Sequence, residues 1–140
     1  MSERVFIDTD IILDLLSRRE PFYPAAAALF SLAERGEVRA CVSSLCFANL
    51  FYILRKELSA PRAIKVLKKL QQIVTVLPVD NLIVSQALDS GFRDFEDALQ
   101  YHAVLAAAIP CLVTRNGRNY PNPEIPVLSA EEFLAQRAMG

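Results

Sequence analysis

Residues 4–10 read Arg4-Val5-Phe6-Ile7-Asp8-Thr9-Asp10, a short apolar run that ends in two carboxylates. The apolar residues predict a buried strand over 5–7, and either Asp8 or Thr9 is suited to cap a following helix. In an open parallel sheet, ligands bind beyond the carboxyl ends of the strands. We therefore expect Asp8 to mark a ligand site, provided that other polar side chains converge on it.

Strand-like and helix-like segments alternate along the rest of the chain. Strands are expected at 5–7, 38–42, 73–77, 111–114 and 127–128, with helices at 11–17, 23–34, 45–58, 61–70, 82–88, 94–108 and from 129 onward. This alternation predicts a parallel sheet with helices on both faces. The expected fold class is α/β, a three-layer doubly wound parallel sheet of four to five strands, and the length suits a single domain over residues 1–140.

The composition is that of a globular protein. Hydrophobic residues make up 53% and charged residues 22%, and the net charge is −1, which argues against a broadly basic nucleic-acid coat. The three cysteines lie in apolar surroundings without CxxC spacing, so we expect buried, reduced thiols. The apolar stretch 103–113 is short and contains Pro110, so no membrane span and a cytoplasmic location are predicted.

A second acidic segment reads Asp94-Phe95-Glu96-Asp97. Helix capping alone would explain Asp94, because it is a favourable N-cap residue. The functional hypothesis is that Asp97, and with it Asp94, approaches Asp8 across the strand ends. Carboxylates held close together repel one another, so a divalent cation would stabilise such a cluster. Carboxylates with open water positions suit Mg²⁺ or Mn²⁺ and the hydrolysis of phosphodiesters.

Asn49 is the one amide in the apolar segment 45–54, which reads LCFANLFYIL. A buried amide without a partner costs about 1–3 kcal/mol. Asn49 therefore needs a partner, and either a polar cavity or a hydrogen bond to neighbouring backbone would provide one.

Polar residues in two further segments could contact a nucleic acid. In the loop that follows the strand at 111–114, Thr114 and Asn119 could bond carboxylates or phosphate, and Arg115 and Arg118 could bind phosphates. A solvated loop is the alternative. Three cations at i, i+3 and i+7 of the helix near 61–70 share one face, which is either simply solvated or an RNA-binding rim: Arg62, Lys65 and Lys69.

Four stretches in this order resemble the PIN-domain nucleases, and in particular the subgroup similar to VapC toxins. They are FIDTDIILDLL (6–16), SSLCFANLFYILRK (43–56), DFEDALQYHAVLAAA (94–108) and LVTRNGRNYP (112–121), and PVLSAEEFL (126–134) resembles the usual ending of the family. The resemblance implies a doubly wound α/β fold and a Mg²⁺- or Mn²⁺-dependent endoribonuclease.

The resemblance also implies roles for individual residues. Asp8 matches the first acidic position of the family, Asp97 the third and Asp94 an auxiliary one, and these three are the implied metal ligands. Thr114 matches the hydroxyl residue that supports the cluster. The chain departs from the family at two positions, because Asn49 stands where many members have Glu and Asn119 where many have Asp. The acidic site is thus depleted, which predicts weaker metal binding unless Asp10 and Glu96 point inward.

The sequence leaves two functional hypotheses. The first is a ribonuclease that hydrolyses RNA phosphodiester bonds, as the toxin of a toxin–antitoxin pair, with RNA, an antitoxin protein and a second copy of the chain as partners. The alternative is a degenerate PIN domain that binds RNA or a protein without cleavage. A receiver-type phosphoacceptor is disfavoured, because it would need an Asp after the third strand and a Lys after the fifth, where Leu77-Pro78 and Ser129 stand.

Overall fold

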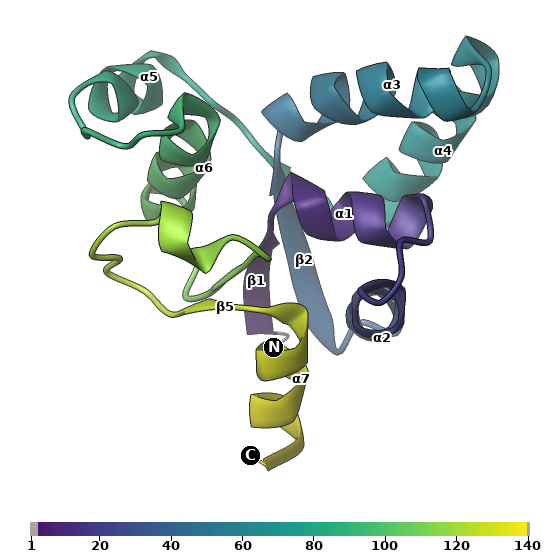
Figure 1. The fold of residues 1–140 in the computed structure, drawn as a ribbon. Coiled ribbons are helices and arrows are strands. Elements are labelled where there is room, and N and C mark those ends of the chain that lie inside the picture. The colour runs from purple at the N-terminus through teal and green to yellow at the C-terminus, as the bar shows by residue number, and fades with distance from the viewer. Residues whose placement is uncertain (1–2, 140) are drawn as a thin grey trace.

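A computed structural model describes residues 3–139. Within them, five strands form one parallel sheet in the order β3-β2-β1-β4-β5 (Figure 1). In chain order the strands are β1 (Glu3–Ile7), β2 (Val38–Ser43), β3 (Thr75–Leu77), β4 (Leu112–Val113) and β5 (Val127–Leu128). The expected α/β class with a parallel sheet is confirmed.

Helices cover both faces of this sheet, as the alternating pattern predicted. They are α1 (Thr9–Leu16), α2 (Tyr23–Glu34), α3 (Leu45–Glu57), α4 (Ala60–Ile73), α5 (Asn81–Leu88), α6 (Phe95–Ala106) and α7 (Ala130–Met139), with a short 3₁₀ helix η1 (Gly117–Asn119). Successive side chains of β1 point to opposite faces. Val5 and Ile7 pack in the core that includes residues of α1 to α4 and α7, whereas Phe6 packs with Tyr101 and Val104 of α6.

The boundary between α4 and β3 differs from the expectation. The β-branched run predicted a strand from residue 73, but α4 continues to Ile73 and β3 begins only at Thr75. Ile73 follows Leu70 and Leu67 at three-residue spacing and packs against the same core, so helical periodicity outweighs local β propensity. The three thiols are free and buried, as expected. Among residues 3–139 no helix is long and apolar enough to cross a membrane.

The register of the sheet brings two polar residues to adjacent strand ends. Ile7 pairs with Val113, the Asp8 N–H donates to the Val113 carbonyl at 2.9 Å, and the Thr114 N–H donates to the Leu128 carbonyl at 2.9 Å. Asp8 and Thr114 therefore leave neighbouring strands at the same edge. In Figure 1 this edge lies between α1 and α3 on one side and α6 on the other.

Candidate active site

Asp8 is a buried carboxylate held by donors from four segments. It is 6% exposed and caps α1, with the Thr9 N–H donating to Oδ1 at 2.6 Å. Gln100 Nε2 also donates to Oδ1, at 3.0 Å. Thr114 Oγ1 lies 2.8 Å and the Tyr120 hydroxyl 3.1 Å from Oδ2. These donors from separate segments fix the orientation of the carboxylate.

Asp97 lies next to Asp8 through a shared tyrosine. The Tyr120 hydroxyl that contacts Asp8 is also 3.3 Å from Asp97 Oδ1, and Gln100 Nε2 lies 3.3 Å from the same hydroxyl. Asp97 stands in the first turn of α6 and is 9% exposed. The structure thus brings together the two carboxylates that the sequence hypothesis required to converge.

Negative charge accumulates around this pair without compensation. Burial, and then the charges of Asp8 and Asp94, raise the pKa of Asp97 to about 6, although hydrogen bonds from Asn119 and Tyr120 lower it. The pKa of Glu96 is also raised, first by burial and then by the same two carboxylates. A cation placed among these groups would relieve the repulsion that raises both pKa values.

Asn49 finds its partner on the opposite wall of the site. Its Nδ2 donates to Glu96 Oε1 at 2.7 Å, so the amide of α3 bonds a carboxylate of α6. The partner is therefore neither the backbone nor an empty cavity. Glu96 points toward α3, which places a carboxylate beside Asn49, where the sequence resemblance implied a Glu.

Asp94 has the capping role that its sequence position suggested. Its Oδ1 accepts the Asp97 N–H at 3.1 Å, and the residue itself is exposed at the start of α6. Its charge contributes to the raised pKa of both Asp97 and Glu96, so it lies within electrostatic reach of them. Capping and metal binding are compatible, because the cap uses one carboxylate oxygen; the metal role stays a prediction.

Asp10 points into the loop after β4. Its Oδ2 lies 3.4 Å from Thr114 Oγ1, 3.1 Å from the Arg115 N–H and 3.0 Å from Asn116 Nδ2. Burial, followed by the charge of Asp8, raises the pKa of Asp10 to about 7. Asp10 therefore anchors the loop that carries Thr114, which agrees with a supporting role.

Arg115 forms an ion pair with a buried acid. Its Nε donates to Asp14 Oδ2 at 2.8 Å, and its guanidinium carbon lies 4.0 Å from the centre of the Phe22 ring. The Asp14 side chain is fully buried. The Arg115 side chain is 28% exposed beside this buried acid, and its role as a phosphate contact stays a prediction.

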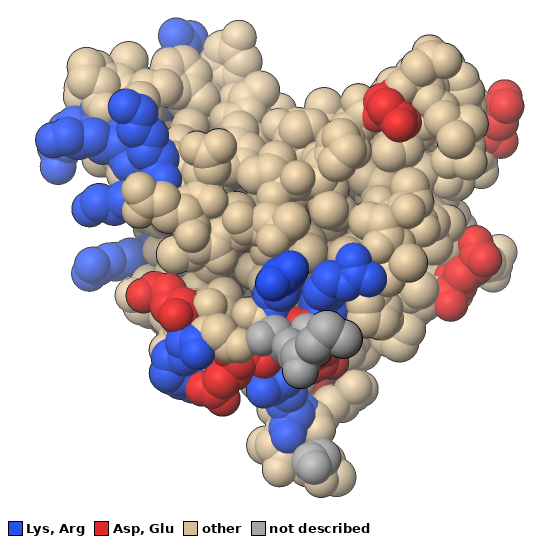
Figure 2. All heavy atoms as spheres, turned by 180° about the vertical axis from the view of Figure 1, so that it is seen from behind, with Lys and Arg blue, Asp and Glu red and all other residues tan. Residues whose placement is uncertain are grey.

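The other proposed RNA contacts are exposed. Arg118 lies in η1, beside the acidic site. The helix α4 carries the remaining three: Arg62, Lys65 and Lys69. Figure 1 shows α4 on the side of α1 and α3, away from α6. Figure 2 shows Lys and Arg side chains gathered along this side of the molecule, with few acids among them. The α4 cations are thus separate from the carboxylate pair.

The carboxylates suit a cation that keeps much of its hydration. Among residues 3–139 no three His, Cys, Asp or Glu side chains come together as a preformed metal-binding group. Mg²⁺ commonly binds proteins through only one or two carboxylates and retains several waters. Asp8 and Asp97, with Tyr120 between them and raised pKa values around them, fit such a hard divalent cation.

Two residues that the sequence hypothesis missed are central to this arrangement. Gln100 is 1% exposed and lies one helical turn after Asp97, so the spacing of two polar residues on a buried helix was an available signal. Tyr120 follows η1 in a proline-rich loop and carried no such signal. Both contacts depend on how distant segments meet.

The family model for the PIN domain matches residues 4–118. The chain belongs to the PIN-domain family. The match includes Asp8, Asp97, Gln100 and Thr114, and it ends just before Asn119 and Tyr120. The resemblance inferred from the four sequence stretches is confirmed.

Relatives of this PIN domain include a ribonuclease. The chain is 29% identical to Ribonuclease VapC1 of Aquifex aeolicus over 138 residues, which cover 94% of each protein. Its fold is similar to the toxin–antitoxin complex from Klebsiella pneumoniae, with a TM-score of 0.68 and 17% identity over 90% of this chain and 97% of the other. It is also similar to DNA-bound VapBC from Salmonella typhimurium, with a TM-score of 0.66 and 19% identity over 93% and 99%.

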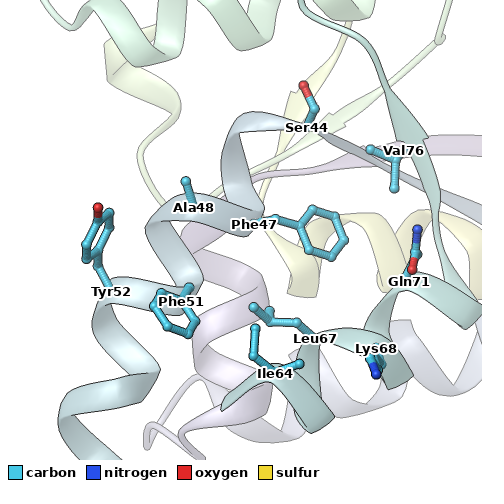
Figure 3. Close-up of a pocket in the computed structure, with 10 residues that line it drawn as sticks. All are labelled: Ser44, Phe47, Ala48, Phe51, Tyr52, Ile64, Leu67, Lys68, Gln71 and Val76. Carbon is cyan, nitrogen blue, oxygen red and sulfur yellow. The ribbon is translucent and has the colours of Figure 1, made fainter. Parts of the chain in front are cut away.

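An apolar groove of about 610 Å³ lies between α3 and α4 of this PIN domain. Figure 3 shows Phe47, Phe51 and Leu67 pointing into it, with Lys68 at its rim. None of the acidic site residues lines it. The groove is therefore separate from the carboxylate site.

Proposed function

We propose that this chain is a divalent-metal-dependent endoribonuclease that hydrolyses RNA phosphodiester bonds. The observation that carries the proposal is the convergence of Asp8 and Asp97 on Tyr120 at the sheet edge of a PIN domain. The similarity to a ribonuclease over nearly the full length of both proteins supports it.

Asp8 and Asp97 would hold the cation, Mg²⁺ or Mn²⁺, with Asp94 beside them. When bound, such an ion supplies Lewis-acid chemistry, lowering the pKa of water and stabilising charge on a phosphoryl group. The residues of this chain prepare the site for it. Thr114 and Gln100 orient the Asp8 carboxylate by donating to different oxygens. Asn119 supports Asp97 by hydrogen bonding.

Asn49 and Glu96 act as a pair in this proposal. Asn49 stands where the sequence resemblance implies a Glu, and it brings no charge. Its Nδ2 donates to Glu96 Oε1 at 2.7 Å across the site. Glu96 thereby supplies the negative charge that the amide lacks. The depleted set of acids at the family positions is partly restored by a neighbour, which is consistent with an active enzyme.

The test compares Asp8→Asn and Asp97→Asn with the parent protein. We expect both variants to lose Mn²⁺ binding in calorimetry and to lose cleavage of a mixed-sequence RNA in Mn²⁺ or Mg²⁺. Asp89→Asn is the matched control, because Asp89 is exposed at the end of α5 and belongs to no acidic cluster of the site. If both site variants bind Mn²⁺ and cut RNA as the parent does, the assignment is wrong.

The degenerate-domain hypothesis makes a different prediction. Asn49 and Asn119 favour it, whereas the ribonuclease relative favours cleavage. A parent protein that binds RNA but leaves it intact in the presence of both cations would replace the nuclease proposal with this alternative.

We further propose that the chain is a toxin with an antitoxin protein as partner and a cytoplasmic location. Solved structures with the same fold include toxin–antitoxin complexes, which supports the partner. Co-expression with the product of the neighbouring gene should yield a complex that copurifies and suppresses RNA cleavage. Free cleavage activity in the presence of that product would contradict it.

A second copy of the chain is the other partner that we propose. Two apolar surfaces are uncovered: the α3–α4 groove, where Ile64 is 45% exposed, and the stripe formed by Val84 and Leu88 on α5, which are 36% and 68% exposed. In a twofold dimer, the α5 stripe of each copy would pack into the groove of the other copy. Both apolar surfaces would then be covered in both copies.

A further inference from the structure

A hollow of about 590 Å³ lies at the start of α6 and is lined by two arginines. Its walls are the turn before α6, with Gly91, Arg93 and Asp94, and the segment after β4, with Arg118 and Asn119. Both arginines are exposed, and among residues 3–139 neither guanidinium is paired with a carboxylate. Two arginines without an ion-pair partner thus line the same open space, together with Asp94.

This hollow adjoins the proposed cleavage site through two residues. Asp94 lines the hollow and accepts the Asp97 N–H, and Asn119 lines it and hydrogen-bonds the Asp97 carboxyl. A phosphodiester strand bound in the hollow would therefore lie next to Asp97. The acidic site itself repels phosphate, so binding of a polyanion needs cations nearby.

Packing below the arginines fixes the two walls relative to each other. Phe92, which precedes Arg93, makes an edge-on contact with Tyr120 at 6.1 Å between ring centres. Gly91 adopts a φ of +74°, which favours glycine, and thereby turns the chain into this wall. Arg93 therefore follows a residue that is packed in place by this ring contact. Backbone that is held in this way loses less entropy when a ligand binds.

We propose that Arg93 and Arg118 form a subsite for a backbone phosphate of the RNA strand, next to the phosphate that is cleaved. The inference rests on the proposed function, because it takes RNA as the ligand. Guanidinium groups match phosphate oxygens with paired N–H donors. Backbone contacts of this kind position a strand without reading its sequence.

The test measures binding of a fluorescein-labelled, mixed-sequence RNA oligonucleotide by anisotropy in EDTA, where no cleavage occurs. We expect R93A/R118A to weaken binding roughly tenfold or more and to reduce the salt slope of the affinity by about 0.7, the contribution of one phosphate of a single strand that is no longer neutralised. R93K/R118K should retain most of the salt slope. The matched control R35A/R39A removes two exposed arginines before and within β2 that have no proposed RNA contact, and should change both quantities less.

Cleavage assays separate this inference from the nuclease proposal. In Mn²⁺, R93A/R118A should raise KM more than it lowers kcat, with Mn²⁺ affinity unchanged. If the parent cuts RNA and R93A/R118A binds RNA with the affinity and salt slope of the R35A/R39A control, the subsite is refuted and the nuclease stands. If the parent never cuts but the double variant loses RNA binding and salt slope as expected, the subsite stands and the nuclease proposal fails.

Discussion

The Tyr120 hydroxyl lies 3.1 Å from Asp8 Oδ2, although 112 residues separate the two in the chain. The same hydroxyl lies 3.3 Å from Asp97 Oδ1 and accepts a hydrogen bond from Gln100 Nε2 at 3.3 Å. One hydroxyl proton serves two carboxylates, so Tyr120 sets how closely they are held. It is 3% exposed, and water cannot easily replace it.

Tyr120→Phe removes this hydroxyl and keeps the ring. We expect Mn²⁺ affinity to fall about tenfold, as is typical when a partner of metal-binding residues is removed. The free energy of unfolding should fall by about 1.5–3 kcal/mol, because a hydrogen bond to a charged group is lost. Calorimetry and urea denaturation measure the two effects.

Tyr101→Phe is the control, because Tyr101 is also buried and its hydroxyl accepts the Glu124 N–H at 2.8 Å without contacting Asp8. It should lower stability alone. Equal Mn²⁺ affinities for the parent and Tyr120→Phe would show that the hydroxyl has no part in shaping the carboxylate pair.

Local sequence patterns predicted the site residues at strand ends. They did not predict the residues that contact these strand ends from distant parts of the chain. Asp8 and Thr114 each follow a short apolar run, and a parallel sheet brings such ends to one edge. Gln100 contacts Asp8 across 92 residues, and its role depends on how α6 packs. The ion pair of Arg115 was missed for the same reason, since its partner Asp14 lies 101 residues earlier and is completely buried.

The Arg115–Asp14 pair gives a prediction for stability. Burial raises the pKa of Asp14, and the hydrogen bond and charge of Arg115 lower it. Arg115→Met leaves a buried carboxylate without its partner, so we expect a decrease of about 3 kcal/mol in the free energy of unfolding near neutral pH. The decrease for Arg115→Lys should be smaller.

The decrease should depend on pH. Without Arg115, the folded state holds the Asp14 proton more tightly than the unfolded state, so the stability of the variant falls as pH rises through the raised pKa. Urea denaturation from about pH 5 to about pH 8 should therefore show a growing difference from the parent. Arg118→Met, which removes an exposed arginine three residues away, should stay within about 0.5 kcal/mol of the parent throughout. A decrease that is the same at both pH values would contradict this account of Asp14.

The three cysteines should be unreactive in the folded protein. Burial raises the pKa of Cys46 to about 12 and that of Cys111 to about 11, and the pKa of Cys41 is raised for the same reason. Because the thiolate is the nucleophile, Ellman's reagent at about pH 8 should label none of them until guanidinium chloride unfolds the chain. Ser85→Cys, on the exposed side of α5, should react at once and serves as the positive control. Rapid labelling of the native parent would mean that these core positions open readily.

The proposed dimer is tested by placing charge on each of its two surfaces. Ile64→Asp puts a carboxylate at the rim of the α3–α4 groove, and Leu88→Asp puts one on the α5 stripe, so each buries an unpaired charge in the dimer. We expect the parent to sediment as a dimer and each variant as a monomer with nearly unchanged thermal stability, because both positions are exposed within one chain. Gln86→Asp adds the same charge elsewhere on α5 and should leave the dimer intact. A monomeric parent would refute the dimer, and dimeric variants would place its interface on another surface.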